Sequence, residues 1–176
     1  MFRRALRLSA APATLAVLLL AACSQPTAPS QATRPTVSDD QMLASIRAAG
    51  DKEKSAIDVN PLRDPGVASL QDAAEGDLRV GKYNEAATKL DQALKLSPNS
   101  PDLLQDRAEL AIRLKDYATA EQLAHRSWDL GPKLGPLCAR NWQTISELRR
   151  HAGDDAGAAA ASKSVAQCHV EGMQRY

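Results

Sequence analysis

Three cysteines and three histidines are the side chains of this sequence best suited to nucleophilic, redox or metal chemistry. They are Cys23, Cys138, Cys168, His125, His151 and His169. None of them falls in a CxxC, HExxH or CxxCH spacing, and no nucleophile elbow, P-loop or dinucleotide-binding fingerprint is present. We therefore expect no catalytic residue, no bound cofactor and no metal site, so the protein is predicted not to be an enzyme.

A set of polar residues carries more information, because the chain repeats it after 34 residues. Gln71, Asp72, Glu75 and Arg79 recur as Gln105, Asp106, Glu109 and Arg113. Intervals of one, four and eight residues from the glutamine place each set roughly along one side of a helix. A stripe of mixed charge suits contacts with a peptide or a helix. Solvent-exposed residues preserved after a duplication are the alternative.

Helices must carry these stripes, and the apolar residues around them have helical spacing. After Gly81, six apolar or amphipathic residues fall at i, i+3, i+4, i+7, i+10 and i+11. Each copy is predicted to be a helix, a break at 80–82 or 114–116, and a second helix that stops before Pro98 or Pro132, since proline cannot continue a helix. A fixed period of this length predicts stacked helical hairpins and an all-α fold.

The first copy resembles a known repeat family. The run GKYNEA from Gly81 to Ala86, followed by ALKLSPN from Ala93 to Asn99, resembles a tetratricopeptide (TPR) repeat. The second copy keeps the tyrosine, the alanine and the proline but has Lys115 in place of the turn glycine, and both copies lack the early tryptophan. The resemblance implies a short TPR-type solenoid with two repeats over 65–134.

A third, diverged hairpin is expected over 135–171, with about four residues inserted before its turn, and 172–176 form a tail. In TPR folds the first helices line a concave groove, so the eight stripe residues are expected to face a partner. Arg140, Gln143 and Glu147 could extend the stripe. TPRs that clamp an acidic C-terminus carry Lys and Asn where this chain has Gln71 and Glu75, which argues against that ligand.

Two cysteines mark the ends of the third hairpin. Cys138 opens its first predicted helix and Cys168 closes its second, and antiparallel helices bring these ends together. In an oxidising compartment a disulfide is therefore expected, which would stabilise the hairpin by about 3–4 kcal/mol. Free buried thiols, or metal ligation together with His151 or His169, are the alternatives left open.

The first 22 residues are predicted to be a secretory signal peptide. Arg3, Arg4 and Arg7 precede an apolar run that is too short to span a bilayer. The run ends in LAAC, from Leu20 to Cys23, which resembles the bacterial lipobox. We therefore expect a lipoprotein that is cleaved before Cys23 and acylated there, for example with palmitate. An ordinary signal peptide in which Cys23 has no role is the alternative.

The residue after the lipobox cysteine bears on which membrane holds the protein. Ser24 follows the cysteine, whereas aspartate at this place resembles the inner-membrane retention signal of enteric bacteria. We expect anchoring in the outer membrane, facing the periplasm, with the inner membrane as the alternative. Three acyl chains on Cys23 would exceed the two membrane-binding signals that stable anchoring requires.

A tether and a lead helix are expected between the anchor and the repeats. Residues 23–37 are rich in Ser, Thr, Gln, Ala and Pro, which predicts a disordered tether. Ser38 and Gln41 form a capping-box pattern, with apolar residues at helical spacing after it. Residues 38–64 are therefore predicted to form a helix that ends near Ile57, followed by a loop. A continuation of the disordered tether is the alternative.

Charge argues against a nucleic-acid partner. The signal segment holds three of the 22 basic residues, which leaves 19 against 21 acidic ones in a remainder without a basic run. We expect a scaffold that holds another envelope protein, by a peptide or helix in the TPR groove, within a pilus, secretion or cell-wall assembly. A permanent structural subunit is the alternative. An enzyme accessory or a ligand-binding lipoprotein ranks below it.

Overall fold

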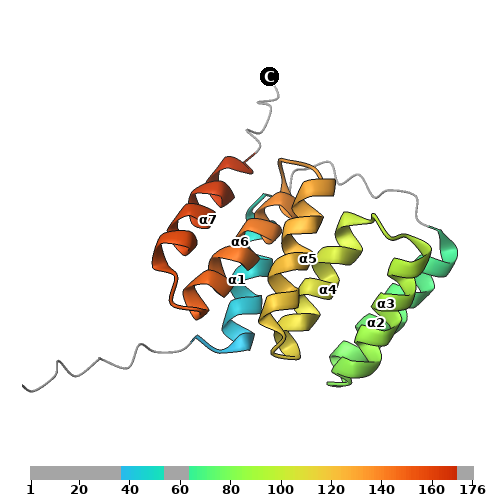
Figure 1. Cartoon of the computed structure of the whole chain (residues 1–176). Coiled ribbons are helices and arrows are strands. Elements are labelled where there is room, and N and C mark those ends of the chain that lie inside the picture. Colours follow the sequence, from blue (N-terminus) through green and yellow to red (C-terminus); the bar gives the residue numbers. More distant parts are fainter. Residues whose placement is uncertain (1–36, 54–63, 170–176) are drawn as a thin grey trace, which may run out of the picture. The chain divides into compact units, whose positions relative to one another are not determined.

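The regular structure of the chain is helical throughout the residues that can be described. The computed structural model describes residues 37–53 and 64–169, which form seven helices and no strand (Figure 1). The helices are α1 (Asp39–Lys52), α2 (Pro65–Arg79), α3 (Tyr83–Leu96), α4 (Pro101–Arg113), α5 (Tyr117–Leu130), α6 (Pro136–His151) and α7 (Asp155–Gln167). The prediction of an all-α, TPR-type fold is confirmed.

All described residues belong to one unit, which comprises residues 35–176. The predicted signal peptide, the lipidation site Cys23, the tether up to residue 36 and the tail at 172–176 lie outside the described residues. Among the residues that are described, no helix combines the length and the apolar character needed to cross a bilayer.

Six helices pair as three antiparallel hairpins, α2–α3, α4–α5 and α6–α7 (Figure 1). Each hairpin turns at a residue with positive φ, namely Gly81 at 75°, Lys115 at 61° and Gly153 at 82°. Left-handed backbone favours glycine, so the second hairpin keeps the turn geometry although lysine stands there. The turns align the hairpins with offsets of 34 and 38 residues, which agrees with the predicted insertion of about four residues in the third.

Local sequence sets where the helices begin. The first helix of every hairpin starts with proline, at Pro65, Pro101 and Pro136, whose fixed φ suits the first helical position. The second helices α5 and α7 are capped by aspartates. Asp116 accepts a hydrogen bond from the Thr119 amide at 3.2 Å, and Asp154 accepts one from the Gly157 amide at 2.8 Å.

Small residues let neighbouring helices approach closely. Ala86 and Ala93 of α3, Ala108 of α4, and Ala120 and Ala124 of α5 are fully buried. Helix α3 packs on α4, and α5 packs on α6, so the second helix of each hairpin joins it to the next. The result is a continuous stack with its first helices α2, α4 and α6 on one side.

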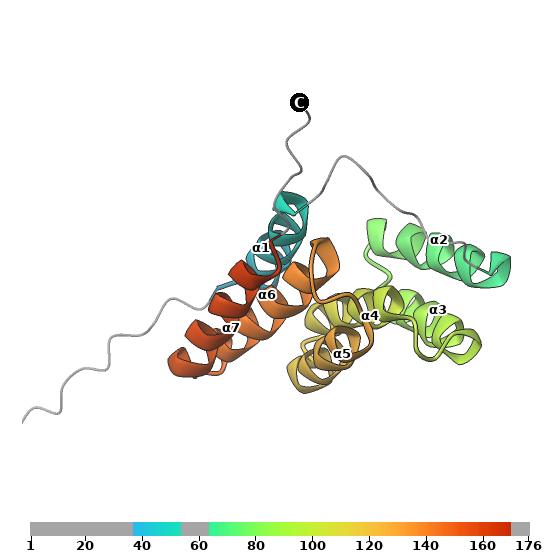
Figure 2. The ribbon, with the colours of Figure 1, turned by 90° about the horizontal axis from the view of Figure 1, so that it is seen from above.

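The lead helix α1 does not stand apart from this stack. It packs on α6 and also contacts α4, and Figure 2 shows α1 and α2 on either side of α4. The predicted capping box is confirmed, because Ser38 and Gln41 cap each other's backbone. The helix ends at Lys52 with Glu53 as its C-cap, earlier than the predicted end near Ile57, and residues 54–63 lie outside the described part.

Candidate functional site

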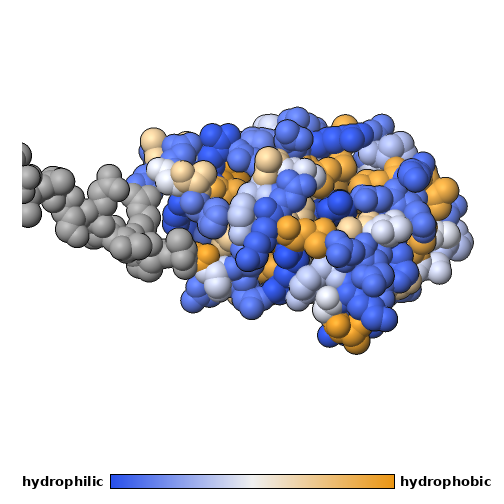
Figure 3. Space-filling view, turned by 60° about the horizontal axis from the view of Figure 1, so that its bottom comes forward, coloured by the Kyte–Doolittle hydropathy of each residue, from blue (hydrophilic) through white to orange (hydrophobic). Residues whose placement is uncertain are grey.

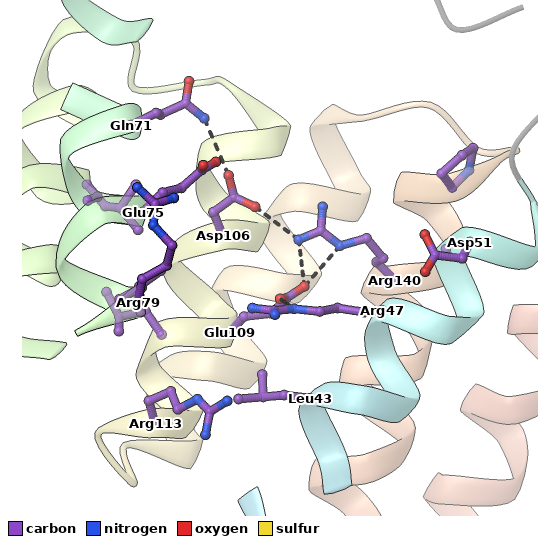
Figure 4. A pocket seen from close by; sticks show the side chains of 16 residues that line it. Leu43, Arg47, Asp51, Gln71, Glu75, Arg79, Asp106, Glu109, Arg113 and Arg140 are labelled. Atoms are coloured by element: carbon purple, nitrogen blue, oxygen red, sulfur yellow. Dashed lines mark hydrogen bonds and ion pairs between the residues drawn. The ribbon is translucent and has the colours of Figure 1, made fainter. Parts of the chain in front are cut away.

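The first helices do face a pocket, of about 550 Å³, whose walls are α2 on one side, α1 on the other and α4 between them (Figure 4). We call this pocket the open groove. Six of the eight predicted stripe residues line it: Gln71, Glu75, Arg79, Asp106, Glu109 and Arg113. Apolar side chains that include Leu78 and Leu110 lie between the charges.

Two of the predicted stripe residues do not line the groove. Gln105 has no exposed surface, and its Nε2 donates to Thr144 Oγ1 of α6 at 2.9 Å and to Glu109 Oε1 at 3.2 Å. The groove expectation is wrong for this residue, because the edge of the stripe is turned toward the neighbouring helix. Asp72 is exposed on α2 and lies outside the pocket.

The centre of the groove is an ion-pair network around the buried Glu109. Arg140 of α6 donates from Nη2 to Glu109 Oε1 at 2.6 Å and to Asp106 Oδ1 at 3.0 Å. Arg47 of α1 donates from Nε to Glu109 Oε2 at 3.2 Å (Figure 4). Gln71 Nε2 donates to the other Asp106 oxygen at 3.4 Å. Two arginines from outside the repeated stripe therefore neutralise the carboxylates of α4.

Burial acts on the protonation of this network. It raises the pKa of Asp106, and the positive charge of Arg140 offsets only part of that rise. Burial acting alone would lower the pKa of Arg140, but Glu109 and Asp106 together raise it above its ordinary value. Arg140 therefore stays charged in this network.

The remaining stripe residue of α4 is also engaged by the chain itself. Arg113 forms an ion pair with Asp40 of α1, and its guanidinium carbon lies 5.8 Å from the centre of the Tyr83 ring. Next to it, the Tyr117 hydroxyl donates to Asp39 Oδ1 at 2.9 Å. The α4 half of the stripe thus holds α1 in place.

The α2 half of the groove is different. Glu75 and Arg79 are exposed, and neither forms an ion pair with any residue in the described parts of the chain. They lie one helical turn apart on the wall opposite α1 (Figure 4). These two side chains are the part of the predicted stripe that lines the groove and carries charges without an ion-pair partner in the described structure.

Comparison with known proteins agrees with this architecture. The family model described as "Tetratricopeptide repeat" matches residues 77–136. The globular C-terminal domain of P. aeruginosa LpoP is similar to this chain, with a TM-score of 0.56 and 30% sequence identity. The match covers 60% of this chain and 99% of that domain. The chain belongs to the tetratricopeptide repeat family. No curated protein matches it in sequence.

Membership of this family indicates the general role of the groove, since TPR domains are scaffolds for protein–protein interaction. In this TPR protein the groove is only partly free, because α1 fills the side formed by α4 and α6. The sequence predicts a helix after Ser38 but not its position against α4 and α6. Asp40 and Arg47 lie two turns apart on this helix, but nothing in the local sequence relates them to Arg113 or Glu109.

The third hairpin carries a cross-link. Cys138 and Cys168 form a disulfide with their Cα atoms 5.6 Å apart, and the Gly135 amide donates to the Cys168 carbonyl at 2.7 Å. The histidines weighed as metal ligands have other neighbours. His169 Nδ1 lies 3.0 Å from Glu53 Oε2, and the His151 ring lies 4.3 Å from the Tyr117 ring.

Proposed function

We propose that this TPR protein is a non-enzymatic scaffold that binds a partner polypeptide of the bacterial envelope in the open groove. One observation carries the proposal: Glu75 and Arg79 stand exposed and without ion-pair partners in the described structure, beside Leu78 and Leu110. Apolar contacts flanked by paired charges are the usual elements of peptide recognition in a groove.

The proposed location in the envelope rests on the N-terminal sequence. We propose that cleavage before Cys23 and acylation there anchor the protein in the outer membrane, with the TPR domain in the periplasm. A disulfide in the third hairpin suits an oxidising compartment. A pilus, a secretion system or the cell-wall machinery is the setting we propose.

A permanent subunit of a complex is the less favoured function. Obligate interfaces are large and hydrophobic, whereas the face shown in Figure 3 is mostly hydrophilic with hydrophobic residues in separate patches. The large exposed apolar residues of the described structure are Val80, Leu96, Leu130 and Leu134. They lie at helix ends or between helices, and none of them lines the groove. An enzyme accessory or a ligand-binding lipoprotein has no feature of its own to support it.

Photo-cross-linking in the native envelope tests the proposal. A photoreactive amino acid at position 75 should give a discrete cross-linked protein, which mass spectrometry identifies. The same amino acid at position 92, where Gln92 is exposed on α3 away from the groove, is the matched control. Equal cross-linking from both positions, or none from position 75, would contradict binding in the open groove.

A further inference from the structure

Helix α1 is an internal example of what this kind of groove binds. It is amphipathic, with Met42, Leu43 and Ile46 almost fully buried. These residues pack in one cluster with Ile112 of α4 and Leu148 of α6. We call this arrangement the occupied groove, formed by the first helices of the second and third hairpins together with α1.

Two ion pairs complement the apolar contacts of α1. Asp40, in its first turn, pairs with Arg113, and Arg47 pairs with Glu109 at 3.2 Å. Asp40 and Arg47 are seven residues apart, which is about two helical turns, so both charges lie on the same side of α1. Glu109 and Arg113 are four residues apart on α4. The occupied groove therefore binds a helix that carries an acidic residue and, two turns later, a basic residue.

The open groove is the same arrangement one repeat earlier. The turn residues Gly81, Lys115 and Gly153 fix the correspondence between hairpins. By that alignment Glu75, Leu78 and Arg79 of α2 correspond to Glu109, Ile112 and Arg113 of α4, and Leu110 corresponds to Leu148. All four residues on the open side line the pocket. In the occupied groove, Glu109 and Arg113 form ion pairs with α1. Their counterparts in the open groove, Glu75 and Arg79, have no ion-pair partner in the described structure.

We propose that the open groove binds an amphipathic helix of a partner protein, oriented like α1 and lying beside it. The partner helix carries an acidic residue opposite Arg79 and a basic residue two turns later opposite Glu75. Its apolar side chains rest on the half-buried Leu78, while Leu110 is already buried beneath it by the chain itself. An extended peptide is disfavoured because the equivalent groove holds a helix. This inference rests on the proposed function and specifies the class of partner.

The helix α1 itself supplies the probe. We choose a peptide of residues 38–53, held helical by a lactam bridge between positions 44 and 48, since Ala44 and Ala48 are exposed on α1. An isolated helix of this length is otherwise only marginally stable. Fluorescence anisotropy of the labelled peptide, titrated with the purified full chain in detergent, measures binding. A scrambled peptide is the negative control.

We expect saturable binding at a single site that weakens about tenfold or more with Arg79→Glu, because like charges then meet. A peptide with Asp40→Arg should restore binding to that variant and bind the unaltered chain poorly. Lys95→Glu makes the same charge change at an exposed position on α3 and should leave binding unchanged.

Three results would overturn the inference. The first is no saturable binding. The second is binding that Arg79→Glu does not weaken, since the peptide would then displace α1 or bind elsewhere. The third is self-association of the chain that Arg79→Glu abolishes, because the occupant would then be a second copy. If position 75 cross-links an envelope protein but the helical peptide does not bind, the proposed function stands and this inference fails. If the peptide binds but nothing is cross-linked, the proposed function fails.

Discussion

The stem of Arg140 lies directly against the backbone of Gly50. A Cβ atom placed on Gly50 would be 2.7 Å from Arg140 Cγ and 3.3 Å from the Pro136 carbonyl oxygen. The absence of a side chain on α1 at this position is therefore what lets Arg140 cross α1 and reach Glu109. Glycine, which weakens a helix in isolation, is here required by the packing of α1 on α6.

Gly50→Ala should therefore destabilise the domain although alanine is the better helix former. The added methyl group must displace the arginine stem or move α1, because a backbone carbonyl blocks the other side. We expect the free energy of unfolding to fall by about 1–2 kcal/mol, measured by chemical denaturation. Gly76→Ala is the matched control, since the closest atom to its Cβ is the end of the Arg79 side chain at 3.7 Å. This control should gain about 0.5–1 kcal/mol, and a gain at both positions would contradict the account.

The two carboxylates that hold Arg140 should respond differently to neutralisation. Glu109→Gln removes the charge that pairs with both Arg47 and Arg140, so the free energy of unfolding at pH 7 should fall by about 1–3 kcal/mol. Asp106→Asn should cost less, because burial penalises the charged form of Asp106 and so offsets part of what its ion pair with Arg140 contributes. The same denaturation experiment at pH 7 compares the two variants.

The raised pKa of Asp106 also predicts a pH dependence with a definite sign. The folded protein binds this proton more tightly than the unfolded chain does, so Asp106 contributes stability that is complete below its ordinary pKa of 3.8 and is lost as the pH rises through the raised value. The unaltered protein should therefore gain stability relative to Asp106→Asn as the pH is lowered from 7 toward 4. A constant difference between the two across this range would show that Asp106 is not perturbed.

Hairpin positions could be predicted from the sequence because each boundary has a local cause. Proline begins α2, α4 and α6, and the spacing of small apolar residues identifies the buried side of α3 and α5. The groove could be predicted only in part. The stripe residues span about 100° of helix surface, so Gln105, at one edge of it, is buried against Thr144, while Asp72, at the other edge of the first copy, is exposed.

The location of α1 could not be predicted from local sequence. Its docking depends on contacts with residues far along the chain, such as Arg113 and Leu148, and no period or motif relates these to Asp40 or Met42. Because α1 engages Arg113, a double replacement of Arg79 and Arg113 would disturb the packing of α1 as well as the open groove. Replacing Arg79 by itself tests the groove without touching α1.

The disulfide predicts a difference between oxidised and reduced protein. Cys138 and Cys168 are 30 residues apart, and closing a loop of this size stabilises by about 3–4 kcal/mol in the chain-entropy model. A reductant should lower the free energy of unfolding by this order, as measured by chemical denaturation. A variant with serine at both positions should match the reduced protein and be insensitive to the reductant. Equal stability with and without reductant would mean that the bond does not form in the native protein.

Lipidation at Cys23 can be tested independently of the groove. Cys23→Ser should abolish incorporation of radiolabelled palmitate and leave an unprocessed precursor. Globomycin, which blocks the lipoprotein signal peptidase, should likewise cause the precursor of the unaltered protein to accumulate. Processing that proceeds unchanged in globomycin would show that the segment is an ordinary signal peptide.

The central claim is that the chain binds its partner through the unpaired charges of α2. The most direct measurement is recovery of the partner from cross-linked envelopes with Arg79→Glu, beside Lys95→Glu, with the thermal unfolding midpoint of each variant determined in parallel. The account predicts that Arg79→Glu loses about nine-tenths of the partner at an unchanged midpoint, whereas Lys95→Glu retains it. Full recovery of the partner by folded Arg79→Glu protein would contradict the account.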